Sequence, residues 1–136
     1  MRIFISGSAA IKELTQEMKD ILDLYMHQGA DFIVGDCEGV DLLAQAYLRC
    51  RGYEKVIVYT SYEKPQGYGA FYKSYRSLAK KAKNKTGNDF LEVKDKAMSE
   101  DCDMALALWN GKSVYTRKNI ARCTELGKKS ILLIAP

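Results

Sequence analysis

Two glycines and three carboxylates follow a short apolar run in the first half of the chain. The run spans residues 32–34, and the seven residues after it include Gly35, Asp36, Glu38, Gly39 and Asp41. Glycine allows positive φ and lets a ligand approach the backbone. From Val40 onward the apolar residues recur at helical spacing, so a helix would direct its unpaired N–H groups at this turn. The order of strand, glycine turn and helix predicts an anion site, with phosphate as the usual guest.

The spacing of this turn excludes two well-known nucleotide motifs. The glycines are arranged Gly-x-x-x-Gly rather than Gly-x-Gly-x-x-Gly, and the chain contains no Gly-x-x-x-x-Gly-Lys-Ser/Thr. The turn is therefore neither a dinucleotide fingerprint nor a P-loop. A glycine turn of this kind also serves as a plain connection between strand and helix, so the prediction of a site needs support from other loops.

Two further loops provide that support. The Ser6-Gly7-Ser8 segment follows the apolar stretch that begins at Ile3, and residues 110–116 follow the continuous apolar stretch 103–109. Hydroxyl groups, a cation and flexible backbone are concentrated in these loops, and they suit the binding of a phosphate. Together with Gly35, Asp36, Gly39 and Asp41, the predicted ligand-binding residues are Gly7, Ser8, Gly111, Lys112, Ser113 and Thr116.

The elements that must position these loops alternate between strands and helices. Apolar runs predict strands over residues 3–6, 32–34, 55–59, 103–109 and 130–134, and helical periodicity predicts helices over residues 11–25, 40–51, 88–98 and 116–126. This pattern indicates a single α/β domain over residues 1–136, a three-layer Rossmann-like fold with a mostly parallel five-stranded sheet. The first strand would lie between the second and fourth, so the three loops would converge at the switch point of the sheet.

The segment from Ser61 to Lys85 has no clear periodicity. Its first part is rich in glycine and aromatic residues, and Arg76 to Lys85 is strongly basic. The aromatic residues could form a lid over a ligand, but we expect most of them to pack on the sheet. The basic run favours a solvated helix face over a nucleic-acid surface. Asn88 and Thr116 are the predicted N-caps of the last two helices.

Composition places the chain among ordinary globular proteins. It has 136 residues, 47% hydrophobic residues and a formal net charge of +4, which favours anionic ligands only weakly. The four cysteines show no Cys-x-x-Cys spacing and only one histidine is present, so we expect buried thiols, no metal and no cofactor. No signal peptide or long apolar span occurs, so we expect a soluble cytoplasmic protein that does not enter membranes.

The same loops carry a family resemblance. The matching segments are Ile5-Ser6-Gly7-Ser8, residues 34–36 with 39–44, and residues 103–109 with Gly111-Lys112-Ser113 and Thr116. They resemble the SLOG superfamily of Rossmann-like domains, which includes cytokinin-activating phosphoribohydrolases, DNA-processing proteins and nucleotide-sensing domains, and most of all its small stand-alone bacterial and phage members. The resemblance implies a nucleotide held by glycine-loop backbone, with Gly7 and Ser8 in the first loop, Gly35, Gly39 and Asp41 in the second, and Gly111, Ser113 and Thr116 on phosphate. Relatives commonly form homo-oligomers.

Three departures from the family pattern bear on chemistry. Relatives often have arginine where this chain has Ala9, and Gly-Thr where it has Tyr115-Thr116. In hydrolytic members a glutamate follows that threonine by three residues, whereas this chain has Asn119. An amide neither stabilises a cationic sugar as an anion nor accepts a proton near pH 7. If the protein is an enzyme, Glu38 or Asp41 could replace the glutamate, although Asp41 is equally suited to cap its helix or to bond a ribose hydroxyl.

Three functional hypotheses follow. The favoured one is the binding of a nucleotide or another phosphate-bearing small molecule by a sensor or sequestering module. The second is an N-glycosidase or deoxyribosyl-transferase-like enzyme that uses Glu38 or Asp41. The third, less favoured, is nucleic-acid binding through the basic run, which predicts strong salt dependence of the affinity.

Overall fold

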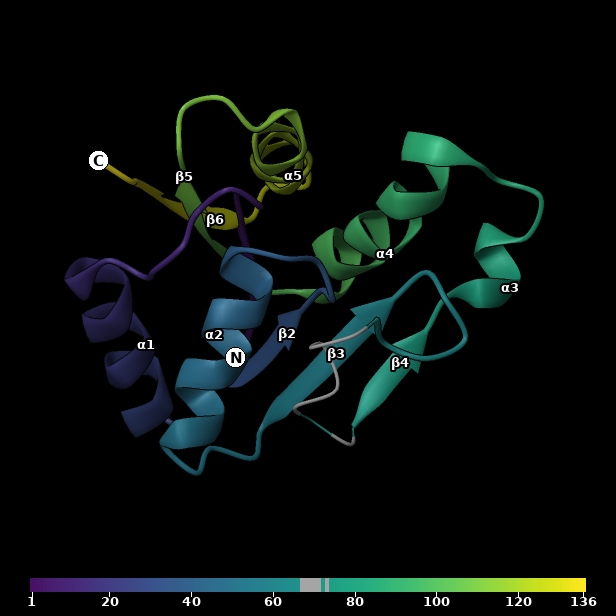
Figure 1. Ribbon diagram of the computed structural model, residues 1–136. Helices are drawn as coiled ribbons and strands as arrows, with labels where there is room; N and C mark the ends of the chain where they lie inside the picture. Colours follow the sequence, from purple (N-terminus) through teal and green to yellow (C-terminus); the bar gives the residue numbers. More distant parts are fainter. Residues whose placement is uncertain (67–71, 73) are drawn as a thin grey trace.

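The computed structural model contains six strands and five helices within the residues it describes, 1–66, 72 and 74–136 (Figure 1). The strands are β1 (Arg2–Gly7), β2 (Asp31–Val34), β3 (Val56–Thr60), β4 (Tyr75–Ser77), β5 (Met104–Trp109) and β6 (Lys129–Ile134). The helices are α1 (Gln16–His27), α2 (Val40–Cys50), α3 (Ala79–Ala82), α4 (Gly87–Asp101) and α5 (Val114–Glu125).

All strands pair in parallel, in the order β4-β3-β2-β1-β5-β6. The α/β prediction is confirmed, including the position of the first strand between β2 and β5. The sheet has six strands rather than five, because Tyr75–Ser77 adds an edge strand beside β3. This strand was not predicted since it is short, all three of its residues are exposed, and it shows no apolar alternation.

Helices cover both faces of the sheet (Figure 1). Side chains alternate across β1, so Ile3 and Ile5 join the core under α1 and α2, while Phe4 joins the core under α4 and α5. The order of strands reverses between β1 and β5. In folds of this kind a crevice opens at that point, outside the carboxyl ends of the strands.

Three helix starts differ from the predictions. The first helix begins at Gln16 rather than near Ile11, because the Thr15 hydroxyl accepts a hydrogen bond from Met18 N at 3.2 Å. Helix α4 begins at Gly87 with Thr86 at the cap position, so Asn88 is not its N-cap. Helix α5 is capped by Ser113, and the prediction that Thr116 caps it was wrong. Apolar periodicity extends beyond a helix, whereas cap hydrogen bonds define where it starts.

The aromatic residues after β3 differ in burial where the structure describes them, since Tyr72 is buried whereas Tyr62 and Tyr75 are exposed. Tyr72 is 5% exposed and its hydroxyl donates to Tyr53 O at 2.8 Å, while Tyr62 makes an edge contact with Phe90 at 4.9 Å between ring centroids. Packing is thus confirmed for Tyr72, and Tyr68 and Phe71 lie outside the described residues. The lysines from Lys80 to Lys85 are exposed.

The cysteines differ in burial. Cys102 and Cys123 are buried as predicted, whereas Cys37 and Cys50 are exposed, so the expectation of buried thiols holds for one pair only. Among the helices that the structure describes, none combines the length and apolar character needed to cross a bilayer.

Candidate functional site

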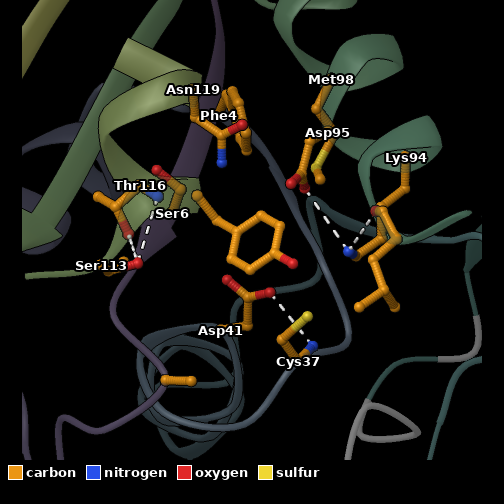
Figure 2. A pocket seen from close by; sticks show the side chains of 14 residues that line it. Phe4, Ser6, Cys37, Asp41, Lys94, Asp95, Met98, Ser113, Thr116 and Asn119 are labelled. Carbon is orange, nitrogen blue, oxygen red and sulfur yellow. Dashed lines mark hydrogen bonds and ion pairs between the residues drawn. The ribbon is translucent and has the colours of Figure 1, made fainter. Parts of the chain in front are cut away.

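A cavity of about 210 Å³ lies at the carboxyl end of β1, between α4 and α5 (Figure 2). Its walls come from β1, α4 and α5, from the loop that precedes α2, and from the first turn of α2. The lining residues are Phe4, Ser6, Gly7, Ala9, Cys37, Asp41, Leu91, Lys94, Asp95, Met98, Ser113, Tyr115, Thr116 and Asn119. The predicted convergence of three loops is therefore present, and α4 closes the space that they leave.

Ser8 joins the three loops. Its N–H donates to Leu108 O at 3.1 Å, its hydroxyl accepts from Asn110 N at 3.0 Å, and its carbonyl accepts from Val40 N at 3.4 Å. Gly39 has a φ of 76°, and a Cβ there would lie 2.4 Å from Ser8 O. Ser8 and Gly39 therefore hold the loops together. The first N–H group of α2, that of Val40, already donates to Ser8 O.

Replacement of Ser8 by alanine is expected to lower the free energy of unfolding by about 1–3 kcal/mol, because it leaves the Asn110 N–H without its acceptor. The matched control is Ser130→Ala, since the Ser130 hydroxyl is buried and has no hydrogen-bond partner in the described part of the chain. That change should be neutral or slightly stabilising. Urea unfolding of both variants measures the difference, and equal effects would contradict a joining role for Ser8.

The predicted ligand-binding residues separate into two groups. Gly7, Asp41, Ser113 and Thr116 line the cavity. Ser8, Gly35, Asp36, Gly39, Gly111 and Lys112 do not line it. Gly111 and Lys112 are exposed in the loop that precedes α5, and Gly35 lies behind Asp41.

Two of the predicted carboxylates have other surroundings. Asp36 Oδ2 accepts hydrogen bonds from Thr60 Oγ1 at 2.6 Å and Gln66 N at 2.9 Å, so this side chain holds the loop after β3. Glu38 is exposed and lines a separate shallow hollow together with Lys12. Among the predicted catalytic carboxylates, Asp41 is the one that lines the cavity.

Asp41 is 8% exposed, in the first turn of α2. Its Oδ2 accepts from Cys37 N at 3.2 Å, and a Cβ at Gly35 would lie 2.6 Å from the same oxygen. Burial raises the pKa of this carboxyl from 3.8 to about 7, although the Lys94 ammonium opposes the shift. At neutral pH the group is divided between its protonated and ionised forms, which suits proton transfer.

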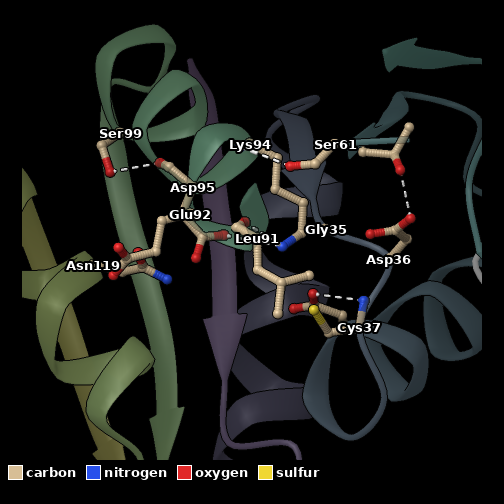
Figure 3. A network of polar contacts seen from close by, with 12 residues as sticks. Gly35, Asp36, Cys37, Ser61, Leu91, Glu92, Lys94, Asp95, Ser99 and Asn119 are labelled. Atoms are coloured by element: carbon tan, nitrogen blue, oxygen red, sulfur yellow. Dashed lines mark hydrogen bonds and ion pairs between the residues drawn. The ribbon is translucent and has the colours of Figure 1, made fainter. Parts of the chain in front are cut away.

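The sequence prediction missed the polar groups that α4 contributes. Lys94 and Asp95 are buried side by side, with Lys94 Nζ 3.6 Å from Asp95 Oδ1 and 3.1 Å from Leu91 O, to which it donates (Figure 3). Burial alone would lower the pKa of Lys94, but the Asp95 carboxylate and the nearby Asp41 raise it, so the ammonium persists. The sequence held one signal for this buried pair. Lys94 and Asp95 lie at helical spacing from the apolar Leu91 and Met98, so two charged residues interrupt an otherwise apolar helix face.

Helix α5 contributes Asn119, which stands where hydrolytic relatives have a glutamate but was not among the predicted ligand-binding residues. Asn119 is 5% exposed, and its Oδ1 accepts from Arg122 Nη1 at 2.7 Å. Arg122 Nη2 lies 3.3 Å from Glu92 Oε1, and Lys118 Nζ lies 3.0 Å from the same oxygen. This network links α4 to α5 across one wall of the cavity.

Two smaller groups complete the walls. The Ser6 hydroxyl lines the cavity, is buried and has no hydrogen-bond partner among the residues that the structure describes. Cys37 is exposed as a residue, but its thiol lines the cavity, where desolvation and the Asp41 carboxylate raise the thiol pKa to about 12. The thiol therefore stays protonated at neutral pH and is a poor nucleophile.

Comparisons with known proteins identify no relative. No family model, no curated protein and no solved structure matches the chain.

Proposed function

We propose that the protein binds a nucleotide or nucleotide-derived ligand in this cavity, as a sensor or sequestering module. The observation that carries the proposal is the cavity itself, at the switch point of a parallel sheet, with apolar walls and a buried Ser6 hydroxyl that lacks a partner. Ligands of open α/β sheets bind at this place, and pockets of this composition suit a flat apolar ring with a few polar groups.

Charge favours one orientation of such a ligand. Asp41 and Asp95 face the interior with Lys94 as the one cation among the described lining residues, so a phosphate inside would meet carboxylates. The amino terminus of α5 begins at the rim, where Ser113 caps the helix and Lys112 is exposed. A helix amino terminus and a nearby lysine both attract anions. The phosphate would therefore bind at α5, and the base or sugar would enter the cavity.

The size of the cavity agrees with this division. Pockets for drug-sized ligands measure about 300–1,000 Å³, whereas this cavity measures about 210 Å³. It suits one part of a nucleotide rather than the whole molecule.

A second candidate is an N-glycosidase or a deoxyribosyl-transferase-like enzyme. The observation that favours it is the Asp41 carboxyl, whose pKa of about 7 suits a general acid or base at neutral pH. Because Glu38 lies outside the cavity, this hypothesis rests on Asp41. Release of free base from nucleotides, abolished in Asp41→Asn, would distinguish it from simple binding.

A thermal-shift screen tests the binding proposal. The ligands are nucleoside mono-, di- and triphosphates, ADP-ribose and cyclic nucleotides. A ligand at about a hundred times its Kd adds about 2.7 kcal/mol to the free energy of unfolding, which for a chain of this size raises Tm by several degrees.

Gly35→Val is the variant that should lose the shift, because a side chain there would displace Asp41 and Lys94. The control is Ala10→Val, an exposed position outside the cavity wall, which should keep the full shift. The absence of a shift with every nucleotide would contradict the proposal. A shift that survives in Gly35→Val would move the binding site elsewhere.

A further inference from the structure

The orientation of the Asn119 amide is fixed by its neighbour. Its Oδ1 accepts from Arg122, and a guanidinium only donates hydrogen bonds, so the oxygen must face Arg122. The Nδ2 group therefore faces the other way, toward the cavity that Asn119 lines (Figure 2). The cavity thus meets a hydrogen-bond donor at this position.

Arg122 is held in turn from the neighbouring helix. Its Nη2 lies 3.3 Å from Oε1 of the buried Glu92, and Lys118 Nζ lies 3.0 Å from the same oxygen. Burial opposes ionisation of Glu92, but these two cations outweigh it and lower its pKa, so the carboxylate stays charged. A flipped amide would place its NH₂ group against the guanidinium, which the network disfavours.

The surroundings of this donor suit a flat ring. Phe4, Leu91 and Met98 supply apolar wall, and the unpartnered Ser6 hydroxyl lines the same space. A polar group that is held in place and left facing a cavity takes its hydrogen bond from water or, when the site is filled, from a ligand. The matching ligand atom is an acceptor on the edge of that ring.

We propose that Asn119 determines base specificity, by donating from Nδ2 to a ring carbonyl oxygen, so that the site selects oxo-bases over amino-bases. The inference rests on the proposed nucleotide binding. It makes Arg122 and Glu92 positioning residues, since they act through Asn119.

Two pairs of nucleotides test the inference, uridine against cytidine monophosphate and inosine against adenosine monophosphate. Each pair exchanges a carbonyl acceptor for an amino donor at one ring position, and the adjacent ring nitrogen changes from an N–H donor to an acceptor. Titration calorimetry on the wild type should give at least about tenfold tighter binding of the oxo member of the pair that fits the cavity, because the amino member leaves the Asn119 donor unpaired.

Asn119→Asp should remove or invert that ratio, because the isosteric carboxylate only accepts hydrogen bonds while it still pairs with Arg122. Asn84→Asp makes the same chemical change at an exposed position and should leave the ratio unaltered. Should Asn119→Asp fail to fold, Asn119→Ser serves instead. Its hydroxyl both donates and accepts, so the ratio should fall to about one.

The outcomes separate the two claims. Equal binding within both pairs by the wild type, or an unchanged ratio in Asn119→Asp, overturns the specificity inference and leaves nucleotide binding intact. Absence of binding by the wild type overturns both. A change of preference cannot arise from a loss of stability, which would weaken both members of a pair alike.

Discussion

Replacement of Lys94 by methionine is expected to lower the free energy of unfolding by about 3–5 kcal/mol at pH 8, the range typical of breaking a buried ion pair. The Lys94 side chain is 3% exposed, and its ammonium lies 3.6 Å from Asp95 Oδ1 and opposes the rise in the pKa of Asp41. Methionine keeps the apolar stem and removes the charge. The carboxyl groups of Asp95 and Asp41 would then lose their cation while remaining buried. Urea unfolding measures the resulting decrease in the free energy of unfolding.

The loss should depend on pH. Burial raises the pKa of Asp95, which Lys94 and Arg122 oppose, and the pKa of Asp41 is also raised. At pH 5 these carboxyl groups take up protons more readily once the ammonium is gone, so the effect of Lys94→Met should shrink there. Adding Asp95→Asn to Lys94→Met should restore part of the stability at pH 8.

Lys96→Met is the matched control, on the same helix but at an exposed position. Exposed substitutions of this kind usually change stability by no more than about 0.5 kcal/mol. Equal losses of unfolding free energy in Lys94→Met and Lys96→Met would show that the buried ammonium does not stabilise the protein by compensating the charge of the buried carboxylates. A loss that is the same at pH 5 and pH 8 would show that carboxyl groups are not its partners.

The part of the site that could be predicted lies at strand ends. Parallel strands end at one edge of the sheet, so the segments after β1, β2 and β5 had to meet, and Gly7, Asp41 and Ser113 do line one cavity. Strand β1 was also placed correctly, because right-handed crossovers and the usual three-layer order leave few arrangements.

The contribution of α4 could not be predicted in the same way. Whether Lys94 is a solvated or a buried lysine depends on contacts with Gly35 and Ser61, which are distant in the sequence. The orientation of Asn119 likewise depends on Glu92 in another helix. Periodicity along one helix does not contain this information, since it is decided by what packs on the helix.

Polar residues in the predicted loops illustrate a second limit. Ser8 and Asp36 have the same residue types and spacing as ligand-binding side chains, yet their polar atoms bond to Asn110 N and Thr60 Oγ1. A tight turn must satisfy its own backbone groups with the same hydroxyls and carboxylates that hold a phosphate. Only the geometry separates the two uses.

Replacement of Asp41 by asparagine should stabilise the protein at pH 8 by about 2–4 kcal/mol and have little effect at pH 4. The folded pKa of about 7 lies above the ordinary value of 3.8, so between these values the folded state keeps a proton that the unfolded chain releases. The free energy of unfolding of the wild type therefore falls as pH rises through this window and levels off above it. A shift of about three pKa units corresponds to about 4 kcal/mol.

Asparagine removes this titration and preserves the shape of the side chain. Its amide oxygen can still accept from Cys37 N, so the turn before α2 should remain intact. The control is Asp20→Asn, at an exposed position where the amide oxygen can keep the hydrogen bond from Gln16. Its effect on Tm should be small and the same at both pH values.

Stability and ligand binding together decide the role of Asp41. Suppose that the ionised carboxyl destabilises the protein and that its removal also abolishes the nucleotide-induced rise in Tm. Asp41 would then serve ligand binding rather than the stability of the fold. If Asp41→Asn instead destabilised the protein equally at pH 4 and pH 8, the carboxyl would be a structural acceptor for the Cys37 amide. The glycosidase hypothesis would then lose the group on which it depends, whereas binding at α5 and recognition by Asn119 would be unaffected.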